Sequence, residues 1–145
     1  MTATTSAPAR TRPSAGRAAV ILVIAVAVAV AGNALIATLA VAAGAPASFG
    51  PLTFPAYTLF TALGIAAGWL GWVIVSRRAR DPRRALLILV PVLTVLSFVP
   101  DVLLLATGFI PGTTTPAVLA LMCMHLVVVA VAVPAYRLAL PAPPR

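Results

Sequence analysis

Four long apolar stretches joined by short connections constrain the fold of this chain more than any other feature. They cover about residues 18–43, 57–76, 85–107 and 117–138. A helix rises 1.5 Å per residue, so about 20 apolar residues cross the roughly 30 Å hydrocarbon core of a bilayer. In lipid, an isolated strand would leave its backbone groups unpaired, whereas a helix satisfies them internally. The stretches therefore predict an all-α fold, an integral membrane four-helix bundle.

Composition supports a membrane protein and argues against other classes. Hydrophobic residues make up 62% of the chain and charged residues 8%, against roughly a quarter charged in soluble domains. Four spans use nearly all of the 145 residues, so no separate soluble domain fits. The net charge of +8 is not accompanied by an Arg-rich face interleaved with aromatic residues, so nucleic acid is not an expected partner. Basic charge supplied only by arginine, with much Ala, Val and Pro, is typical of a high-GC genome and indicates a bacterial source.

Arginines occur only in alternate connections, which predicts the orientation. Three precede the first span, none lie in the first loop, five lie in the second, none in the third, and two lie at the inner end of the last span or after it. The five of the basic second loop are Arg77, Arg78, Arg80, Arg83 and Arg84. By the positive-inside rule both termini are cytoplasmic, in the plasma membrane of a bacterial cell. Residues 1–17 are predicted to be a disordered cytoplasmic tail and residues 139–145 a Pro-rich cytoplasmic tail.

The first stretch also resembles a secretory signal, because arginines precede it and small residues follow it. A signal sequence has an apolar region of about 7 to 15 residues, and the run over 18–43 is markedly longer. An uncleaved span is therefore the favoured interpretation. Cleavage would leave three spans.

The second span presents one face suited to helix packing. At 100° per residue, a sector of roughly 80° holds Tyr57, Thr61, Gly64, Gly68 and Gly71. Gly64 and Gly68 form a GxxxG motif, which lets another backbone approach closely. Both a contact within the chain and one between copies satisfy this motif, and packing within the chain is favoured.

Aromatic side chains mark the ends of two spans. Tyr57 lies near one end of the second span, Trp69 and Trp72 near its other end, and Tyr136 near the last end of the fourth. Such rings are typical of the interface between membrane and water. Tyr57, Trp69 and Trp72 therefore predict an aromatic belt at each interface.

Asp101 is the most informative single residue, because an ionisable group inside a span is costly and usually faces the bundle. It shares a sector of about 60° with Thr94 and Ser97. Pro100 cannot bond the carbonyl of Leu96, so the helix is expected to kink or break around Val99–Asp101. In the alternative interpretation, Asp101 caps the broken helix near the outer surface.

An outward-opening polar pocket is the hypothesis that these residues suggest. Its members are Asp101, His125, Asn33, Tyr57, Thr61 and Ser97. A His–Asp pair in such a pocket can hold or relay a proton. In the alternative interpretation, a neutral His or Asn simply bonds one neighbouring helix.

Metal and enzyme chemistry have little support in the sequence. Met122, Cys123, Met124 and His125 offer soft ligands, yet only Met122 and His125 share a helix face. Two ligands do not make a metal site, and no Ser-His, Cys-His or HExxH arrangement occurs. The sequence therefore predicts no metal, no cofactor and no enzyme activity.

Four different short motifs follow one another along the chain: Phe54–Tyr57, the glycines from Gly64 to Gly71, Ser97–Asp101 and Met124–Leu126. With these motifs the chain resembles a family of small four-helix membrane proteins found in actinobacteria and classed as a domain of unknown function. The resemblance covers about residues 17–137. It implies a membrane location and supplies no catalytic residues.

Two functions follow as hypotheses. A structural, accessory or partner-binding role in the membrane is favoured, with the Gly face and the basic loop contacting a second copy, another membrane protein or anionic lipid. The alternative is binding or transport of a small solute or a proton through the outer-half polar pocket. The lipid bilayer is the partner common to both.

Overall fold

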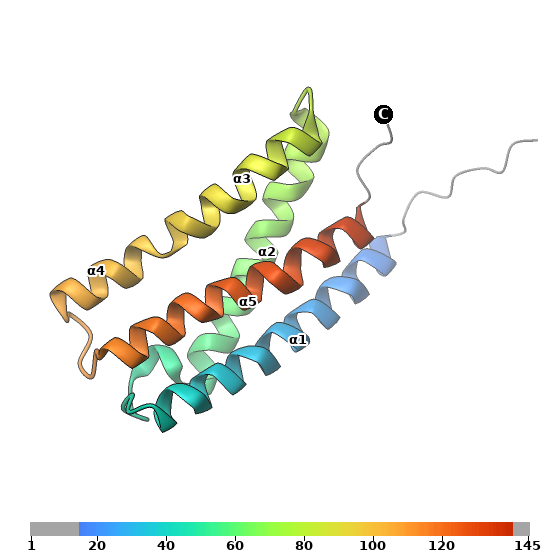
Figure 1. Ribbon diagram of the computed structural model, residues 1–145. Coiled ribbons are helices and arrows are strands. Elements are labelled where there is room, and N and C mark those ends of the chain that lie inside the picture. Colours follow the sequence, from blue (N-terminus) through green and yellow to red (C-terminus); the bar gives the residue numbers. More distant parts are fainter. Residues whose placement is uncertain (1–14, 141–145) are drawn as a thin grey trace, which may run out of the picture.

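The computed structural model describes residues 15–140, which are helical apart from short turns and loops. The elements are α1 (Ala15–Ala42), η1 (Gly50–Leu52), α2 (Phe54–Arg78), α3 (Pro82–Ser97), α4 (Val99–Thr107) and α5 (Thr115–Ala139) (Figure 1). Because α3 and α4 follow each other in one segment, the described residues hold four helical segments long and apolar enough to cross a membrane. The predicted all-α, four-segment architecture is confirmed.

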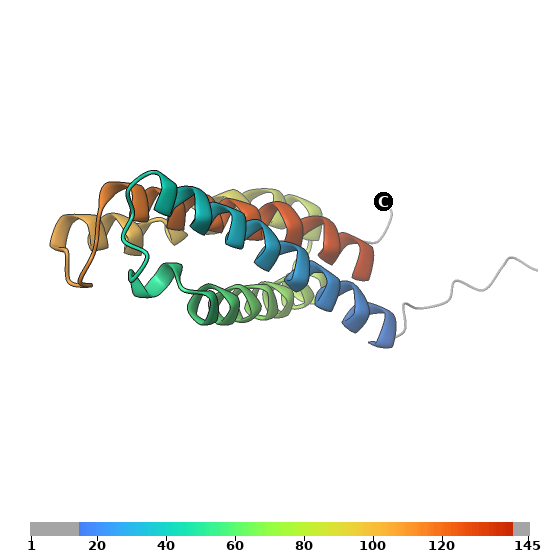
Figure 2. The ribbon, with the colours of Figure 1, turned by 90° about the horizontal axis from the view of Figure 1, so that it is seen from below.

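The helices are arranged around two distinct ends. The start of α1 and the end of α5 lie at one end, here called the Arg end, together with the turn between α2 and α3 (Figure 1). The loops 43–53 and 108–114 lie at the other, here called the Phe49 end. Seen from below, α2 lies beneath a layer formed by α1, α5 and the α3–α4 segment (Figure 2).

Helix starts fall a few residues earlier than the predicted spans, because local caps extend the helices. The carboxylate of Asp81 accepts a hydrogen bond of 3.1 Å from the backbone N–H of Arg84, and Pro82 stands at the start of α3, where its missing N–H costs nothing. α1 begins at Ala15, so Ala15–Arg17 are helical and not part of a tail. The rest of the two predicted tails, residues 1–14 and 141–145, lies outside the described residues.

Small residues bring α1 and α5 together along most of their length, in the most extensive helix contact of the described chain. The buried alanines are Ala25, Ala29, Ala37 and Ala40 on α1 and Ala117, Ala120, Ala132, Ala135 and Ala139 on α5. A Cβ on Gly32 would lie 2.9 Å from a methyl carbon of Val127, which shows how closely the backbones approach. The main packing face is therefore an alanine stripe on α1 and α5, of the small-xxx-small kind found between membrane helices.

The aromatic side chains predicted to form interfacial belts pack inside the bundle instead. At the Arg end, Trp72 and Tyr136 join Ile65, Ala29 and Ala132 in one buried cluster. The centroids of the Trp72 and Tyr136 rings are 5.7 Å apart. The belt prediction is therefore wrong for Trp72, because α5 brings Tyr136 against α2 and covers the Trp72 ring.

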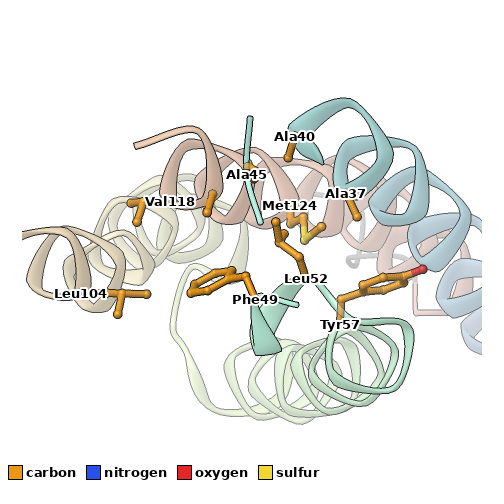
Figure 3. Close-up of a cluster of buried hydrophobic side chains, with 11 residues drawn as sticks. Ala37, Ala40, Ala45, Phe49, Leu52, Tyr57, Leu104, Val118 and Met124 are labelled. Atoms are coloured by element: carbon orange, nitrogen blue, oxygen red, sulfur yellow. The ribbon is translucent and has the colours of Figure 1, made fainter. Parts of the chain in front are cut away.

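Tyr57 and Phe49 close the opposite end. Phe49, from the loop between α1 and α2, is fully buried against Leu104 of α4 and Val118 of α5 (Figure 3). Tyr57 belongs to the same cluster and is also buried, so it does not form a belt. The loop thus fills the space between α2 and α4 with an aromatic ring.

The α3–α4 segment breaks at Phe98, just before the predicted position. The backbone N–H of Phe98 bonds the carbonyl of Val95 at 3.1 Å, which ends α3, and Pro100 stands in the first turn of α4. α3 has no buried residue. This segment is the least enclosed of the four.

Candidate functional site

The break in the α3–α4 segment places Asp101 against His125 of α5. Nε2 of His125 lies 3.4 Å from Oδ2 of Asp101. Asp101 is in the first turn of α4, where the helix dipole favours a negative charge. The sequence could not show that these two groups meet, and the structure brings them together.

The two members of the pair differ in exposure. The side chain of Asp101 is 8% exposed and that of His125 is 37% exposed. Oδ2 of Asp101 is buried and accepts no hydrogen bond within the described part of the chain, so its contact with His125 is a close approach of two ionisable groups and not a hydrogen bond. The arrangement is a buried carboxylate with an unfilled bonding position, covered by a half-exposed imidazole.

The alternative interpretation held that Asp101 caps α4, and the structure contradicts it. The N-cap residue is Phe98, and its side chain makes no capping hydrogen bond. The ring of Phe98 instead stacks on the imidazole of His125, with centroids 6.2 Å apart and an angle of 5° between the planes. His125 is therefore held between an aromatic ring and a carboxylate, both at the start of α4.

The pair lies well inside the helical layer. His125 is ten residues after Thr115, the first residue of α5, which is about 15 Å along the helix axis. Asp101 is six residues before Thr107, the last residue of α4, or about 9 Å. Both residues thus lie away from the ends of α4 and α5 at the Phe49 end.

Asn33 and Thr61 form a second, separate polar pair between α1 and α2. The Asn33 amide donates a hydrogen bond of 2.8 Å to the Thr61 hydroxyl, and both side chains are buried. Oδ1 of Asn33 is buried and has no partner among the described residues. This pair corresponds to the interpretation in which a neutral amide bonds one neighbouring helix.

Tyr57 and Ser97, the other two members of the predicted pocket, face different surroundings. Tyr57 lines a groove of about 370 Å³ together with Ala34, Ala37 and Thr38 of α1. The hydroxyl of Ser97 donates to the backbone carbonyl of Thr94 on its own helix, at 2.7 Å. Within residues 15–140, no hydrogen bond or ion pair connects these groups to Asp101 or His125. The six residues of the predicted pocket thus lie at separate sites in the bundle, and among the described residues only Asp101 with His125 and Asn33 with Thr61 are in polar contact.

Only one of the three glycines on α2 approaches another helix closely. A Cβ on Gly68 would lie 2.5 Å from the hydroxyl of Tyr136, whereas one on Gly64 or Gly71 would meet no atom within 4 Å. Tyr136 reaches past Gly68 and donates a hydrogen bond of 2.6 Å to the backbone carbonyl of Ile65. Tyr136 is an important residue that could not be singled out from the sequence, because nothing in the sequence pairs it with Gly68.

The basic residues cluster at the Arg end. Five exposed arginines lie at the end of α2, in the following turn and in the first turn of α3: Arg77, Arg78, Arg80, Arg83 and Arg84. Asp81, the one acid among them, caps α3. In the described residues no group of three His, Cys, Asp or Glu side chains is placed to hold a metal ion.

Comparison with known proteins gives a family and no activity. No curated protein matches the chain, and no solved structure matches it. A family model described as a family of unknown function, DUF6069, matches residues 8–142, nearly the whole sequence. The chain therefore belongs to the DUF6069 family.

Proposed function

We propose that this chain is a multi-pass protein of the bacterial plasma membrane with both termini in the cytoplasm. Four helical segments are long and apolar enough to span the bilayer. The exposed arginines gather at the end where α1 begins and α5 ends. The positive-inside rule assigns that end to the cytoplasm, and the Phe49 end to the outer side.

The function that the geometry supports best is reversible proton binding by Asp101 and His125. The observation that carries it is their 3.4 Å contact at membrane depth, with Oδ2 of Asp101 buried and accepting no hydrogen bond. Ionisable residues inside spans are costly and mark ion or proton pathways. This is binding of a proton, with no catalytic step, no cofactor and no nucleic acid.

The charge of the pair explains why it would hold one proton. With one proton shared between the two side chains, the net charge of the pair is zero. This holds whether the pair is carboxylate and imidazolium or carboxylic acid and imidazole. Loss of that proton leaves a net charge of −1, and gain of a second leaves +1. A low-dielectric site penalises either net charge. One proton shared between the two side chains is therefore the charge state that such a site favours.

Infrared difference spectroscopy of purified protein in lipid nanodiscs tests this function. The chain has only two acidic side chains, Asp101 and Asp81, and one histidine, so the carboxyl and imidazole bands are few. We expect a carboxyl band and the imidazole ring modes to change in the same pH step in the wild type. Asp101→Asn removes that carboxyl band and moves the imidazole step.

Asp81→Asn is the matched control, because Asp81 is the other acid and caps α3 outside the pair. It should leave the coupled step in place. Carboxyl and imidazole bands that change at unrelated pH values, or an imidazole step identical in wild type and Asp101→Asn, would exclude proton binding by the pair.

A structural, accessory or partner-binding role is the second candidate. It is favoured by the exposure of α3, which has no buried residue although it belongs to a span. In that role Asp101 and His125 only hold α4 against α5. Asp101→Asn would then lower the amount of folded protein in the membrane without a separate change in proton binding.

A further inference from the structure

We infer that the basic turn between α2 and α3, residues 77–84, binds the phosphate groups of anionic phospholipids at the membrane surface. The inference names the partner of this turn. It rests on the proposed membrane location and not on proton binding by Asp101 and His125. The experiment below distinguishes a failure of the membrane location from a failure of the lipid contact.

The first step is a concentrated charge that the protein itself does not neutralise. Residues 77–84 hold five arginines and one aspartate, a net charge of +4, and all five arginines are exposed. Among the described residues, none of their guanidinium groups forms an ion pair or a hydrogen bond. The carboxylate of Asp81 instead accepts a hydrogen bond from the backbone N–H of Arg84. The positive charge is therefore available to an anion outside the protein.

The second step is the level of these arginines along the helices. α2 has 25 residues, so its axis is about 36 Å long, whereas the hydrocarbon core of a bilayer is roughly 30 Å thick. Arg77 and Arg78 are the last two residues of α2, and Arg83 and Arg84 lie in the first turn of α3. When α2 spans a bilayer, these four residues lie where the hydrocarbon ends and the headgroups begin.

The third step is the choice of a lipid over a soluble acidic protein. Only Ala79, Arg80 and Asp81 separate the two helices, so the turn is too short to extend away from the membrane surface. A guanidinium group forms forked hydrogen bonds that match phosphate oxygens, and its long side chain reaches from a helix end to the headgroups. Basic clusters beside a span attract anionic lipids. Lipid phosphates thus lie at the level of the arginines and supply the negative charge that the turn lacks.

The two native tryptophans, the only ones in the chain, report on lipid at this end of the bundle. Trp69 and Trp72 lie on α2, about 12 Å and about 8 Å along the helix axis from Arg77. The purified protein is placed in vesicles of equal parts phosphatidylglycerol and phosphatidylcholine, with quenching bromine on the acyl chains of one lipid at a time. We expect bromine on the anionic lipid to quench the tryptophan fluorescence about twice as strongly as bromine on the zwitterionic lipid.

Two matched variants test whether the charge of the turn causes this preference. In the first, four arginines become glutamine together, and the two brominated lipids should then quench equally: Arg77→Gln, Arg78→Gln, Arg83→Gln and Arg84→Gln. In the second, the same four become lysine, which keeps the charge and should keep most of the preference. Both leaflets of the vesicles have the same composition, so the orientation of the protein does not affect the comparison.

The outcomes separate the two claims. Equal quenching by the two lipids in the wild type would overturn the inference, and an acidic protein would then be the partner to seek for the turn. A preference that survives in the glutamine variant, or that the lysine variant loses as completely, would also overturn it, because charge would not be its cause. Quenching by neither lipid would contradict the membrane location itself, and the lipid contact with it.

Discussion

The α1–α2–α5 core and the α3–α4 segment are built on different principles, although both belong to the same bundle. In the most apolar part of α5, 28% of the residues are buried, whereas the corresponding part of the α3–α4 segment is 6% buried. The core is held by alanines and a tyrosine bonded across two helices. The α3–α4 segment is anchored chiefly by Asp101 and Leu104, its buried residues.

The two polar pairs follow the same division. Asn33 and Thr61 are neutral, buried and directly hydrogen-bonded, as expected of groups that hold helices together. Asp101 and His125 are ionisable and differ in exposure, and their 3.4 Å contact is not a hydrogen bond. The first pair is therefore structural, and the second is the candidate for function.

The largest effect is expected from Ala29→Leu in the core. Ala29 is completely buried between α1, α2 and α5, and a leucine there has no space to occupy. We expect a loss of about 3 kcal/mol in unfolding free energy, the upper range for overpacking. Reversible unfolding in mixed micelles measures it. Ala27→Leu on the exposed side of α1 is the control and should be close to wild type.

Gly68→Ala should have the next largest effect. Its Cβ would collide with the Tyr136 hydroxyl and displace the hydrogen bond to Ile65, with a cost of about 2 kcal/mol from overpacking and the lost bond. The matched control Gly64→Ala meets open space and should be neutral or slightly stabilising. Equal losses for the two variants in the same unfolding assay would contradict the assigned packing face.

A smaller effect is expected from the Asn33–Thr61 hydrogen bond. In a double-mutant cycle of Asn33→Ala and Thr61→Ala, the coupling energy should be about 1 kcal/mol, within the range measured for hydrogen bonds between membrane helices. The cycle isolates the pair from the packing lost in each single variant. A coupling near zero would show that the amide and the hydroxyl do not stabilise the core.

The smallest effect is expected from Leu93→Ala on α3. Leu93 is 59% exposed, and lipid is as apolar as the side chain that it would replace. The unfolding free energy should change by less than about 0.5 kcal/mol. A loss comparable to that of Ala29→Leu would mean that α3 is packed against protein in the monomer, which would erase the contrast between the two regions.

Much of this architecture could be predicted from the sequence, because it depends on local properties. Apolar length predicts the four segments, and Pro100 predicts a break near Asp101. What could not be predicted depends on which helices are neighbours. Gly68 receives Tyr136 only because α5 lies against α2, and the alanines of α1 become the main interface only because α5 matches them.

The candidate site shows the same limit. Asp101 and His125 stand out as ionisable residues in apolar stretches, so the sequence selects them one by one. The sequence analysis grouped them with Asn33, Tyr57 and Thr61 by assuming one shared pocket. These three residues lie instead between α1 and α2. Helical periodicity predicts which residues share a face of one helix, but not which faces of different helices meet.

The contact between Asp101 and His125, at 3.4 Å between α4 and α5, is the observation on which the proposed function depends. Nitrogen-15 solid-state NMR of the single imidazole in lipid vesicles tests it most directly, in wild type, Asp101→Asn and the control Asp81→Asn. We predict that Asp101→Asn alone changes the ring nitrogen resonances, because it removes the carboxylate beside Nε2. Identical spectra from all three proteins would contradict the pair, and with it the proposed function.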